Sequence, residues 1–479
     1  MVELLDGRGG SKTIALWASA FALAAAAWPA STGATERGAT APSRCRNIAK
    51  LTVPRAEEQK KDCLDDLTTA GTSESGHTNT SDWSGLHAEA TRNPSGVPGI
   101  QIDGYFPDDS RTNSNNGWLH DSQFVIRLPA RWNGKLVITG APGVRRQYAN
   151  DFIFADWVLA RGYAFASTDK GNTEVLFSED GADPADAVAE WHRRVTQLTR
   201  ATKAVVEQRY GQRPKRTYVA GISNGGYLAR WALEHHPEMY DGALDWEGTL
   251  IQAASPNLFT YLPVALRNYP DFEATGSEEA RRRMLDAGFA EGSEFLWEYH
   301  YSVYWDLTQR IYREEFDPDY DGALHGGIPF CQQGTPNCDA DYDYEARPQE
   351  VKEAIDRVSN SGDIGKPMMT LHGTLDALLP IETDSDVYRR MVRAAGRARL
   401  HRYYVIEDGN HVDGLYDDYP GRLRPMLPCV RAAFKALERW VERAAPPPRT
   451  RLVDRPRKGD VVNSCAIGPA VYGGSWSGR

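Results

Sequence analysis

The sequence predicts an α/β protein, with a mostly parallel sheet flanked by helices on both faces. Short β-rich runs alternate with stretches of helical periodicity, which is typical of parallel sheets. One of these runs leads into a serine-bearing turn that opens a helix, at residues 221–225. The chain has 479 residues, of which 41% are hydrophobic and 25% are charged. This length and composition suffice for one large catalytic domain with an inserted subdomain.

The regular part begins with two extended stretches, residues 99–105 and 123–128, joined by turn-rich sequence. They are predicted to form an antiparallel hairpin at an edge of the sheet. The alternation then sets in, and the spacing of apolar residues separates strands from helices. Strands are predicted at 135–139, 163–168, 216–220 and 242–246, and helices at 151–161, 187–210 and 225–235.

The alternation is interrupted at residues 248–365, which we interpret as a lid insertion. This stretch contains two helical segments, 277–290 and 295–313, followed by an acidic portion rich in Gly and Pro. The alternation resumes with strands at 367–371 and 401–406 and helices at 384–395 and 423–441. The predicted organisation is therefore a catalytic core over 83–247 and 366–445, the lid over 248–365 and a tail over 446–479.

The N-terminus is predicted to be a secretory signal peptide, residues 1–34. Arg8 and Lys12 precede an apolar run over residues 13–30, and small residues follow, with Ala34 as the last residue before cleavage. This is the layout of an exported protein, although a permanent membrane anchor is the alternative. Residues 35–82 are polar and are expected to lie over the surface. We predict a secreted, extracellular protein without stable membrane association after cleavage.

Cysteine usage also indicates export. The chain has six cysteines, and an even number suits an oxidising compartment. Pairing that closes the shortest loops predicts three disulfides: Cys45–Cys63, Cys331–Cys338 and Cys429–Cys465. This connectivity is one of about 15 possible. The cysteine and histidine spacings do not indicate zinc. The net charge of −10 argues against a nucleic-acid partner.

The strongest chemical signal is Gly221-Ile222-Ser223-Asn224-Gly225, which matches G-x-S-x-G. It follows a predicted strand and opens a predicted helix, the context in which this motif presents a nucleophilic serine. Small neighbours are needed because the turn is tight. The helix N-terminus favours developing negative charge. Ser223 is therefore the candidate nucleophile, and a helix-capping serine in an ordinary turn is the alternative.

A nucleophilic serine needs a base, and the base needs an acid to orient it. Asp376 lies in the loop after the predicted strand 367–371, and His411 lies in the loop after the last strand of the alternation. Their order along the chain, Ser, Asp and then His, is that of this motif's fold. Asp245 and Glu247, which end the strand after the nucleophile helix, are rival acids. Of the remaining histidines, His372 is expected to support the loop that carries Asp376.

Further candidates are less sharply defined. Oxyanion donors are expected at the backbone N–H of Asn224 and at that of Ala141, with Gly140 as second choice because Pro142 lacks an N–H. Lys170 and Glu247 are candidates for contacting substrate, although a structural salt bridge explains Lys170 equally well. The sequence Asp317, Asp319, Asp321 resembles the start of a calcium loop, but position 328 is Ile, so an EF-hand is excluded. A looser Ca²⁺ site in the lid and a solvated acidic turn stay as alternatives.

With this triad and motif, residues 83–445 resemble the α/β-hydrolase superfamily. The mid-chain insertion and the sequences Ser-Thr-Asp-Lys-Gly (167–171) and Ser-Asn-Gly-Gly (223–226) are similar to two groups within it. One is the tannase and feruloyl esterase family, and the other is the secreted 3-hydroxybutyrate oligomer hydrolases. Tannase relatives typically carry a disulfide between cysteines beside the serine and the histidine. Ile222 and Val412 occupy those positions here.

The resemblance implies a serine esterase that acts by an acyl-enzyme mechanism on a small or oligomeric carboxylic ester. Phenolic esters and hydroxyalkanoate oligomers are the substrates that the two groups suggest. The triad needs no cofactor, whereas the tannase resemblance suggests calcium in the lid. The alternatives are an exported peptidase or amidase of the same fold and a catalytically silent binding protein. The triad residues are all present, which disfavours the silent protein.

Overall fold

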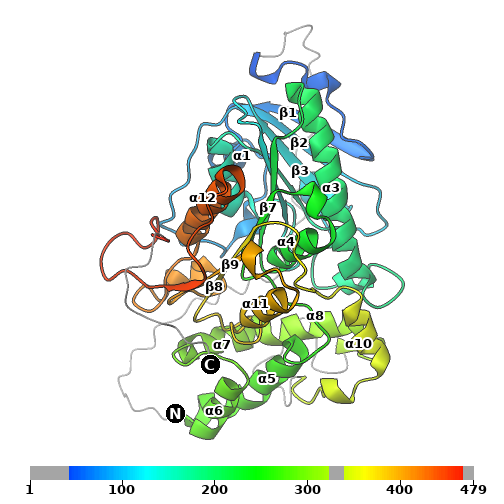
Figure 1. The fold of residues 1–479 in the computed structure, drawn as a ribbon. Helices are drawn as coiled ribbons and strands as arrows, with labels where there is room; N and C mark the ends of the chain where they lie inside the picture. The colour runs from blue at the N-terminus through cyan, green and yellow to red at the C-terminus, as the bar shows by residue number, and fades with distance from the viewer. Residues whose placement is uncertain (1–42, 323–338, 468–479) are drawn as a thin grey trace, which may run out of the picture. The chain divides into compact units, whose positions relative to one another are not determined.

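The computed structural model describes residues 43–322 and 339–467, and these residues form a ten-stranded sheet with helices on both faces (Figure 1). The strands are β1 (Glu58–Leu64), β2 (Gly99–Tyr105), β3 (Gln123–Pro129), β4 (Lys135–Gly140), β5 (Ala164–Thr168), β6 (Arg216–Ile222), β7 (Gly242–Trp246), β8 (Met368–Gly373), β9 (His401–Ile406) and β10 (Arg451–Val453). Their order in the sheet is β1-β2-β3-β5-β4-β6-β7-β8-β9-β10. Pairing is antiparallel from β1 to β5 and parallel from there to β10. The order β2-β3-β5-β4-β6-β7-β8-β9 is that of the α/β-hydrolase fold, so the predicted fold class is confirmed.

The antiparallel end of the sheet is one strand wider than the sequence predicts. The hairpin partners β2 and β3 pair as expected, with Ile102 opposite Ile126. Strand β1 lies outside them and pairs with β2, with Glu58 opposite Tyr105. It comes from the segment expected to lie over the surface. Its sequence, Glu-Gln-Lys-Lys-Asp-Cys-Leu, is highly charged, as is common for an edge strand, and charges mask the apolar signal of a strand.

Two groups of helices cover the two faces of the sheet. One face carries α3 (Asp186–Tyr210), α4 (Asn224–His235) and α11 (Ser385–Ala394). They are linked by the hydrogen bonds His192–Tyr227 (2.6 Å) and Tyr388–Glu234 (2.8 Å). The other face carries α12 (Leu427–Arg443) and α2 (Asp156–Ala160), which continues the π-helical turn Asp151–Ala155. Figure 1 shows α3 and α12 on opposite sides of the strands. A short helix, α1 (Thr69–Glu74), lies near the N-terminal end.

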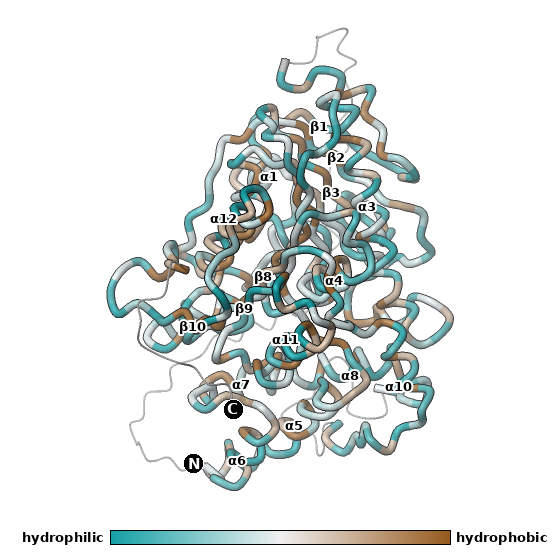
Figure 2. Tube along the Cα trace, in the orientation of Figure 1, coloured by the Kyte–Doolittle hydropathy of each residue, from teal (hydrophilic) through white to brown (hydrophobic). Residues whose placement is uncertain are grey.

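The core lies between these helices and the sheet. All residues of β3, β5, β7 and β8 are buried, as expected for strands covered on both faces. In Figure 2 hydrophobic residues gather along the strands, whereas hydrophilic residues mark the outer helices such as α6 (Glu278–Asp286). The sheet is therefore a rigid base for the loops at its carboxyl edge.

The insertion between β7 and β8 forms a helical layer, lowest in Figure 1. Trp305 donates its indole N–H to the carbonyl of Ala377 at 2.7 Å, so the insertion lies at the carboxyl edge of the sheet. Besides α6, its helices are α5 (Leu258–Thr275), α7 (Trp297–His300), α8 (Asp306–Phe316) and α10 (Gln349–Asp356), with a π-helical turn at Tyr301–Trp305 between α7 and α8. The helix predicted over 295–313 is thus present with an irregular middle.

Helix α5 was not predicted from the sequence. It contains Pro263 and Pro270, and proline is unfavourable inside a helix. Its start is held by a reciprocal cap. Phe259 donates its N–H to the side chain of Asn257 (3.0 Å), and Asn257 donates its N–H to the Thr260 hydroxyl (3.0 Å). The apolar residues buried along α5 supply the remaining stabilisation.

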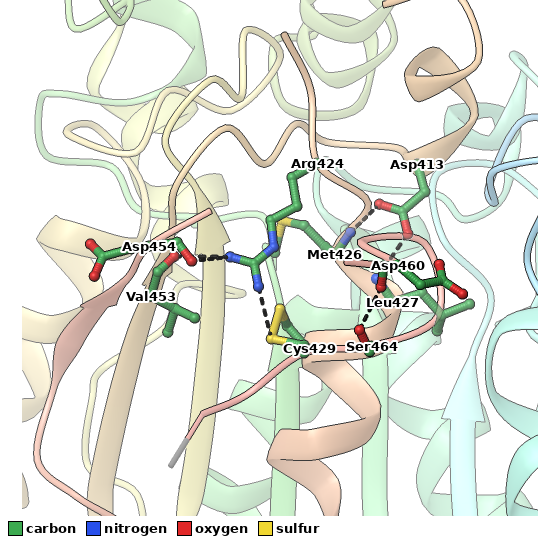
Figure 3. The surroundings of a disulfide bond; sticks show 10 residues. Asp413, Arg424, Met426, Leu427, Cys429, Val453, Asp454, Asp460 and Ser464 are labelled. Carbon is green, nitrogen blue, oxygen red and sulfur yellow. Dashed lines mark hydrogen bonds between the residues drawn. A yellow bond between two sulfur atoms is a disulfide. The ribbon is translucent and has the colours of Figure 1, made fainter. Parts of the chain in front are cut away.

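Two of the three predicted disulfides are confirmed. Cys45–Cys63 ties the N-terminal segment to β1, and Cys429–Cys465 ties the tail to α12 (Figure 3). The predicted pair Cys331–Cys338 and the predicted signal peptide lie outside the described residues. Across 43–322 and 339–467, every helix falls short of the length or apolar character that crossing a bilayer requires.

Candidate active site

Ser223 lies in the turn between β6 and α4, the strand–turn–helix context that the motif requires. Its φ is 56° and its ψ is −125°, a conformation that is unfavourable for a residue with a side chain. A Cβ at Gly221 would lie 2.1 Å from the carbonyl carbon of Gly225, and one at Gly225 would lie 2.5 Å from the carbonyl oxygen of Gly140. Both glycines are therefore required by close backbone contacts.

His411 and Asp376 meet at the carboxyl edge of the neighbouring strands. His411 follows β9 and Asp376 follows β8, and the distance from His411 Nδ1 to Asp376 Oδ2 is 2.8 Å. The other carboxylate oxygen of Asp376 accepts the N–H groups of Leu378 and Leu379, both at 2.9 Å. Both side chains are almost completely buried. The arrangement orients the imidazole as a general base requires.

Asp376 is held in its ionised form. Burial alone would raise the pKa of this carboxyl, but the charge of His411 and hydrogen bonds from His372 and His411 outweigh burial and hold the pKa far below its ordinary value. Nε2 of His372 lies 3.3 Å from Asp376 Oδ2 and 2.9 Å from the carbonyl of Leu379. His372 therefore supports the loop that carries Asp376, as the sequence predicts.

Backbone hydrogen bonds connect Ser223 to the end of β7, which lies beside this pair. Its N–H donates to the carbonyl of Trp246 at 3.1 Å, and the next residue, Glu247, has Oε2 4.0 Å from His411 Nδ1. The N–H of Thr249 donates back to the carbonyl of Ser223 at 3.2 Å. Within the described residues the Ser223 hydroxyl and His411 do not form a hydrogen bond. Such contacts are often long in free enzymes and shorten when substrate binds.

The two rival acids have other partners. Asp245 binds the Arg230 guanidinium at 2.8 Å and the Thr370 hydroxyl at 2.8 Å. Glu247 accepts the N–H of Gly373 at 2.6 Å, and burial together with the charge of Asp376 raises its pKa well above the ordinary value. Glu247 is completely buried, so its side chain is not exposed for the contact with substrate that the sequence suggested. Asp376 is the acid in hydrogen-bond contact with His411.

The prediction that the N–H of Ala141 is the second oxyanion donor is wrong. Its N–H donates to the carbonyl of Thr168 at 3.0 Å, because the β4–β5 pairing continues one residue past the strand. The N–H groups of Asn224 and Gly143 form no backbone hydrogen bond in the described part of the chain. The Asn224 side chain donates to the carbonyl of Gly143 at 3.1 Å, which ties this loop to the nucleophile turn. Gly143, with φ of 51°, is the better candidate.

The structure buries Lys170 without the salt bridge that the sequence allowed, since within the described residues its Nζ donates to a backbone carbonyl and not to a carboxylate. Its side chain is completely buried, its Nζ donates to the carbonyl of Asp169 at 3.2 Å, and it lies 5.2 Å from the centre of the Trp191 ring. Burial lowers its pKa to about 7. The Asp169 carboxylate in turn accepts N–H groups from Asn113 (2.8 Å) and Gln123 (2.9 Å). Lys170 belongs to this buried network, which supports the loop after β5.

The side chains of the acidic triplet in the insertion do not gather around one point. Asp317 is buried and bound by Arg347 Nε at 2.6 Å and by the hydroxyl of Tyr342 at 2.7 Å, whereas Asp319 is exposed. Within the described residues, the groups of donor atoms close enough to share an ion do not include this triplet. The guanidinium of Arg347 takes the place that the calcium hypothesis assigned to an ion, because it neutralises the buried carboxylate.

Sequence reasoning missed two residues of the insertion at this site. The Tyr312 hydroxyl, on α8, donates to Asn224 Oδ1 at 2.6 Å. His300, at the end of α7, is completely buried near Asp376, His411 and Asn410, and burial lowers its pKa to about 3. Only the tertiary structure brings these residues to the triad, since they are more than 70 positions away from Ser223 in sequence.

Two family models match separate parts of the chain. Residues 112–249 match the model described as tannase and feruloyl esterase, and residues 320–472 match the model described as 3HB-oligomer hydrolase. The first segment contains Ser223, and the second contains Asp376 and His411. The chain therefore resembles both groups that the motifs suggest.

Curated relatives match over short stretches. Mono(2-hydroxyethyl) terephthalate hydrolase of Piscinibacter sakaiensis is 27% identical over 140 residues, which is 26% of this chain and 23% of that protein. D-(-)-3-hydroxybutyrate oligomer hydrolase of Azoarcus sp. (strain BH72) is 30% identical over 131 residues, which is 26% of this chain and 19% of that protein. The chain thus matches about a fifth of the length of each relative.

Solved structures match over most of the chain at low identity. Feruloyl esterase B from Aspergillus oryzae matches with a TM-score of 0.47 and 13% identity, and the matched region spans 85% of this chain and 91% of the feruloyl esterase chain. Tannin acyl hydrolase from Aspergillus niger has a TM-score of 0.48 and 13% identity, and covers 84% and 87%.

Proposed function

We propose that this protein is a serine hydrolase of carboxylic esters, with Ser223 as nucleophile, His411 as base and Asp376 as acid. The observation that supports this most directly is the 2.8 Å hydrogen bond between His411 and Asp376 beside the strained turn of Ser223. Both family models and both curated relatives carry names of ester hydrolases, which favours an ester over an amide.

The reaction follows from the roles of these groups. The Ser223 hydroxyl attacks the ester carbonyl while His411 Nε2 takes its proton, and Asp376 stabilises the imidazolium that forms. His411 then gives the proton to the leaving alcohol. Water attacks the acyl-enzyme by the same relay and releases the acid. The N–H groups of Asn224 and Gly143 are the proposed donors to the tetrahedral oxyanion, where each donor is worth about 3–4 kcal/mol.

The insertion over residues 248–365 is the proposed lid. Its helix α7 brings His300 close to Asp376 and His411, and α8 brings Tyr312 to Asn224, which supports a lid over the carboxyl edge of the sheet. Substrate selection would depend on it. The names of the relatives suggest aromatic esters or 3-hydroxybutyrate oligomers as the acyl part.

Export is the proposed location. Two disulfides in the described residues suit an oxidising compartment, and the predicted signal peptide over residues 1–34 supplies the route. Expression of the full chain with its leader should yield a secreted protein whose N-terminus begins at Thr35. Retention of the uncleaved chain in the membrane would contradict this proposal.

The activity is tested with a panel of esters and one amide. The panel holds p-nitrophenyl acetate, butyrate and octanoate, methyl gallate, methyl ferulate, a 3-hydroxybutyrate trimer and a p-nitroanilide. We expect ester hydrolysis that falls on the order of 10³-fold or more in Ser223→Ala, since the serine carries the acyl group. Preferential cleavage of the anilide would identify a peptidase instead. Absence of serine-dependent turnover with a folded protein would refute the esterase.

A further inference from the structure

Glu247 is a second buried carboxyl beside the triad. It follows β7, one strand away from the strand that precedes Asp376, and its N–H donates to the carbonyl of Leu371 in β8 at 2.8 Å. Its φ is 47°, an unfavourable backbone conformation that aims the side chain towards the loop after β8. Oε1 accepts the N–H of Gly373 at 2.6 Å. The backbone strain and this hydrogen bond fix the position of the carboxyl.

The second oxygen of Glu247 points to the imidazole. Oε2 lies 4.0 Å from His411 Nδ1, and within the described residues it accepts no hydrogen bond of ordinary geometry although it is buried. Donor atoms of Glu247, Asp376 and His411 all lie within 4.8 Å of one another. A buried carboxyl oxygen without a hydrogen bond of ordinary geometry is unfavourable, and the side chain of Trp246 is the further polar group that interacts with this carboxyl. The position of Oε2 beside Nδ1, the atom that Asp376 binds, suits an acceptor there once the Glu247 carboxyl is ionised.

The charges around Glu247 explain why its carboxyl does not accept the His411 Nδ1–H while Asp376 is ionised. Burial, the charge of Asp376 and that of Asp413, which follows β9, all keep the Glu247 carboxyl protonated. His372 and His300 also lie close to Asp376, and each interacts with its charge. Loss of the Asp376 charge would remove one of the like charges, so Glu247 would release its proton more readily.

We propose that Glu247 is a second acid of this catalytic centre, a positioning residue that holds the Asp376 loop through Gly373 and whose Oε2 accepts the His411 Nδ1–H when Asp376 does not. This proposal rests on the serine hydrolase function. Taking over requires one proton to leave Glu247 Oε2 for solvent, after which the carboxylate accepts the Nδ1–H at a distance that must shorten by about 1 Å for a hydrogen bond. The step needs no co-reactant.

The test compares Asp376→Ala, Glu247→Gln and the double variant with the natural chain and with Ser223→Ala. Glutamine keeps the acceptor for Gly373 but cannot ionise. We expect Asp376→Ala to retain hydrolysis above the Ser223→Ala level, with kcat rising with pH as Glu247 ionises. Adding Glu247→Gln should remove this alkaline rise and lower kcat roughly tenfold or more. A merely structural role for Glu247 would not produce a change in the pH profile.

A second readout does not depend on turnover. The proton on His411 Nδ1 gives a strongly downfield NMR signal when a carboxylate accepts it. We expect this signal in Asp376→Ala at alkaline pH and its loss in the double variant, with all proteins checked for folding by thermal melting. Equal kcat, equal pH profiles and equal spectra for Asp376→Ala and the double variant would overturn the second acid. Lack of activity in the natural chain would refute the esterase alone, because the spectra still test Glu247.

Discussion

Asn224, the residue after the proposed nucleophile Ser223, is held by both the core and the insertion. Its side-chain oxygen accepts hydrogen bonds from the Thr249 hydroxyl (3.0 Å) and the Tyr312 hydroxyl (2.6 Å), and its side-chain N–H donates to Gly143. The N–H of Asn224 is one of the proposed oxyanion donors, so these contacts hold a catalytic group at a set angle. A small rotation here would weaken the oxyanion hydrogen bond, which depends on geometry.

The first prediction concerns this anchoring. Tyr312→Phe removes one hydroxyl without opening a cavity and leaves the side-chain oxygen of Asn224 with the Thr249 hydroxyl as its remaining donor. A buried hydrogen bond contributes about 1 kcal/mol, so we expect kcat for esters to fall roughly fivefold with little change in KM. Steady-state kinetics on a p-nitrophenyl ester measure this. Tyr304→Phe, a lid tyrosine beside Tyr299, is the matched control. A change in KM alone would show that Tyr312 contacts substrate instead.

At the scale of elements, the crossing of β4 and α4 allows no side chain at Gly225. The backbone oxygen of Gly140 lies 2.5 Å from where a Cβ at this position would be, and backbone atoms cannot rotate out of the way. This contact holds the nucleophile turn against the loop that carries Gly143. Helix α4 and strand β4 are therefore coupled through two glycines.

We predict that Gly225→Ala destabilises the protein and reduces its activity. Overpacking of this kind typically costs about 1–3 kcal/mol in the free energy of unfolding, and displacement of Ser223 would lower kcat as well. Gly421→Ala is the control, because a Cβ at Gly421 meets open space. Thermal melting and ester kinetics test both variants. Equal melting temperatures for the two would contradict the contact.

Helix α8 of the insertion is attached to the core helix α3 by a buried carboxyl. Oε1 of Glu315 accepts the N–H of Val188 at 3.0 Å, and its backbone carbonyl accepts the N–H of Ala185 at 3.1 Å. Burial, with a smaller contribution from the charge of Asp186, raises the pKa of Glu315 to about 9. The carboxyl is therefore neutral in the folded protein at neutral pH.

The third prediction is a pH dependence of stability. The folded carboxyl of Glu315 keeps its proton up to about pH 9, whereas the unfolded one releases it near its ordinary value of about 4.5. Since the folded state binds more protons in this window, Glu315 makes stability fall as pH rises from about 4.5 to 9. Glu315→Gln should remove this part of the slope. Free energies of unfolding at several pH values measure it, and parallel curves for the two proteins would contradict it.

At the scale of the whole molecule, the two described disulfides attach the outermost described segments to β1 and to α12. The Cys429–Cys465 bond joins α12 to the tail, and Arg424 binds the carbonyls of Val453 and Asp454, both at 3.0 Å (Figure 3). Asp413 accepts the N–H groups of Met426 (2.6 Å) and Leu427 (2.8 Å) at the start of α12. The tail, α12 and the loop after His411 thus form one connected region.

The fourth prediction follows from the sizes of the loops. The sequence separations are 36 for Cys429–Cys465 and 18 for Cys45–Cys63. Loop-closure entropy gives stabilisation of ~4 kcal/mol for the longer loop and ~3 kcal/mol for the shorter one. Replacing each pair by serines should lower the free energy of unfolding measured in urea, and the loss should be larger for Cys429–Cys465 than for Cys45–Cys63. Unchanged stability of both double variants under non-reducing conditions would contradict it.

Much of the core was determined by local sequence. The period of apolar residues distinguishes buried strands such as β6 from amphipathic helices such as α3, and the motif around Ser223 requires the turn that the structure shows. The positions of Asp376 and His411 followed from the strands that precede them, because parallel strands end at one edge of the sheet. The two described disulfides followed from the shortest loops.

The tertiary structure decided what depends on partners distant in sequence. The charged edge strand β1 has no apolar pattern of its own, and α5 forms despite two prolines because its cap and buried face offset them. The N–H of Ala141 is taken by Thr168, and Asp317 is neutralised by Arg347, neither of which a local motif reveals. Glu247 acquires its place beside His411 only through the pairing of β7 with β8. Hydrogen bonds and burial between distant segments fix these groups, so only the folded chain shows them.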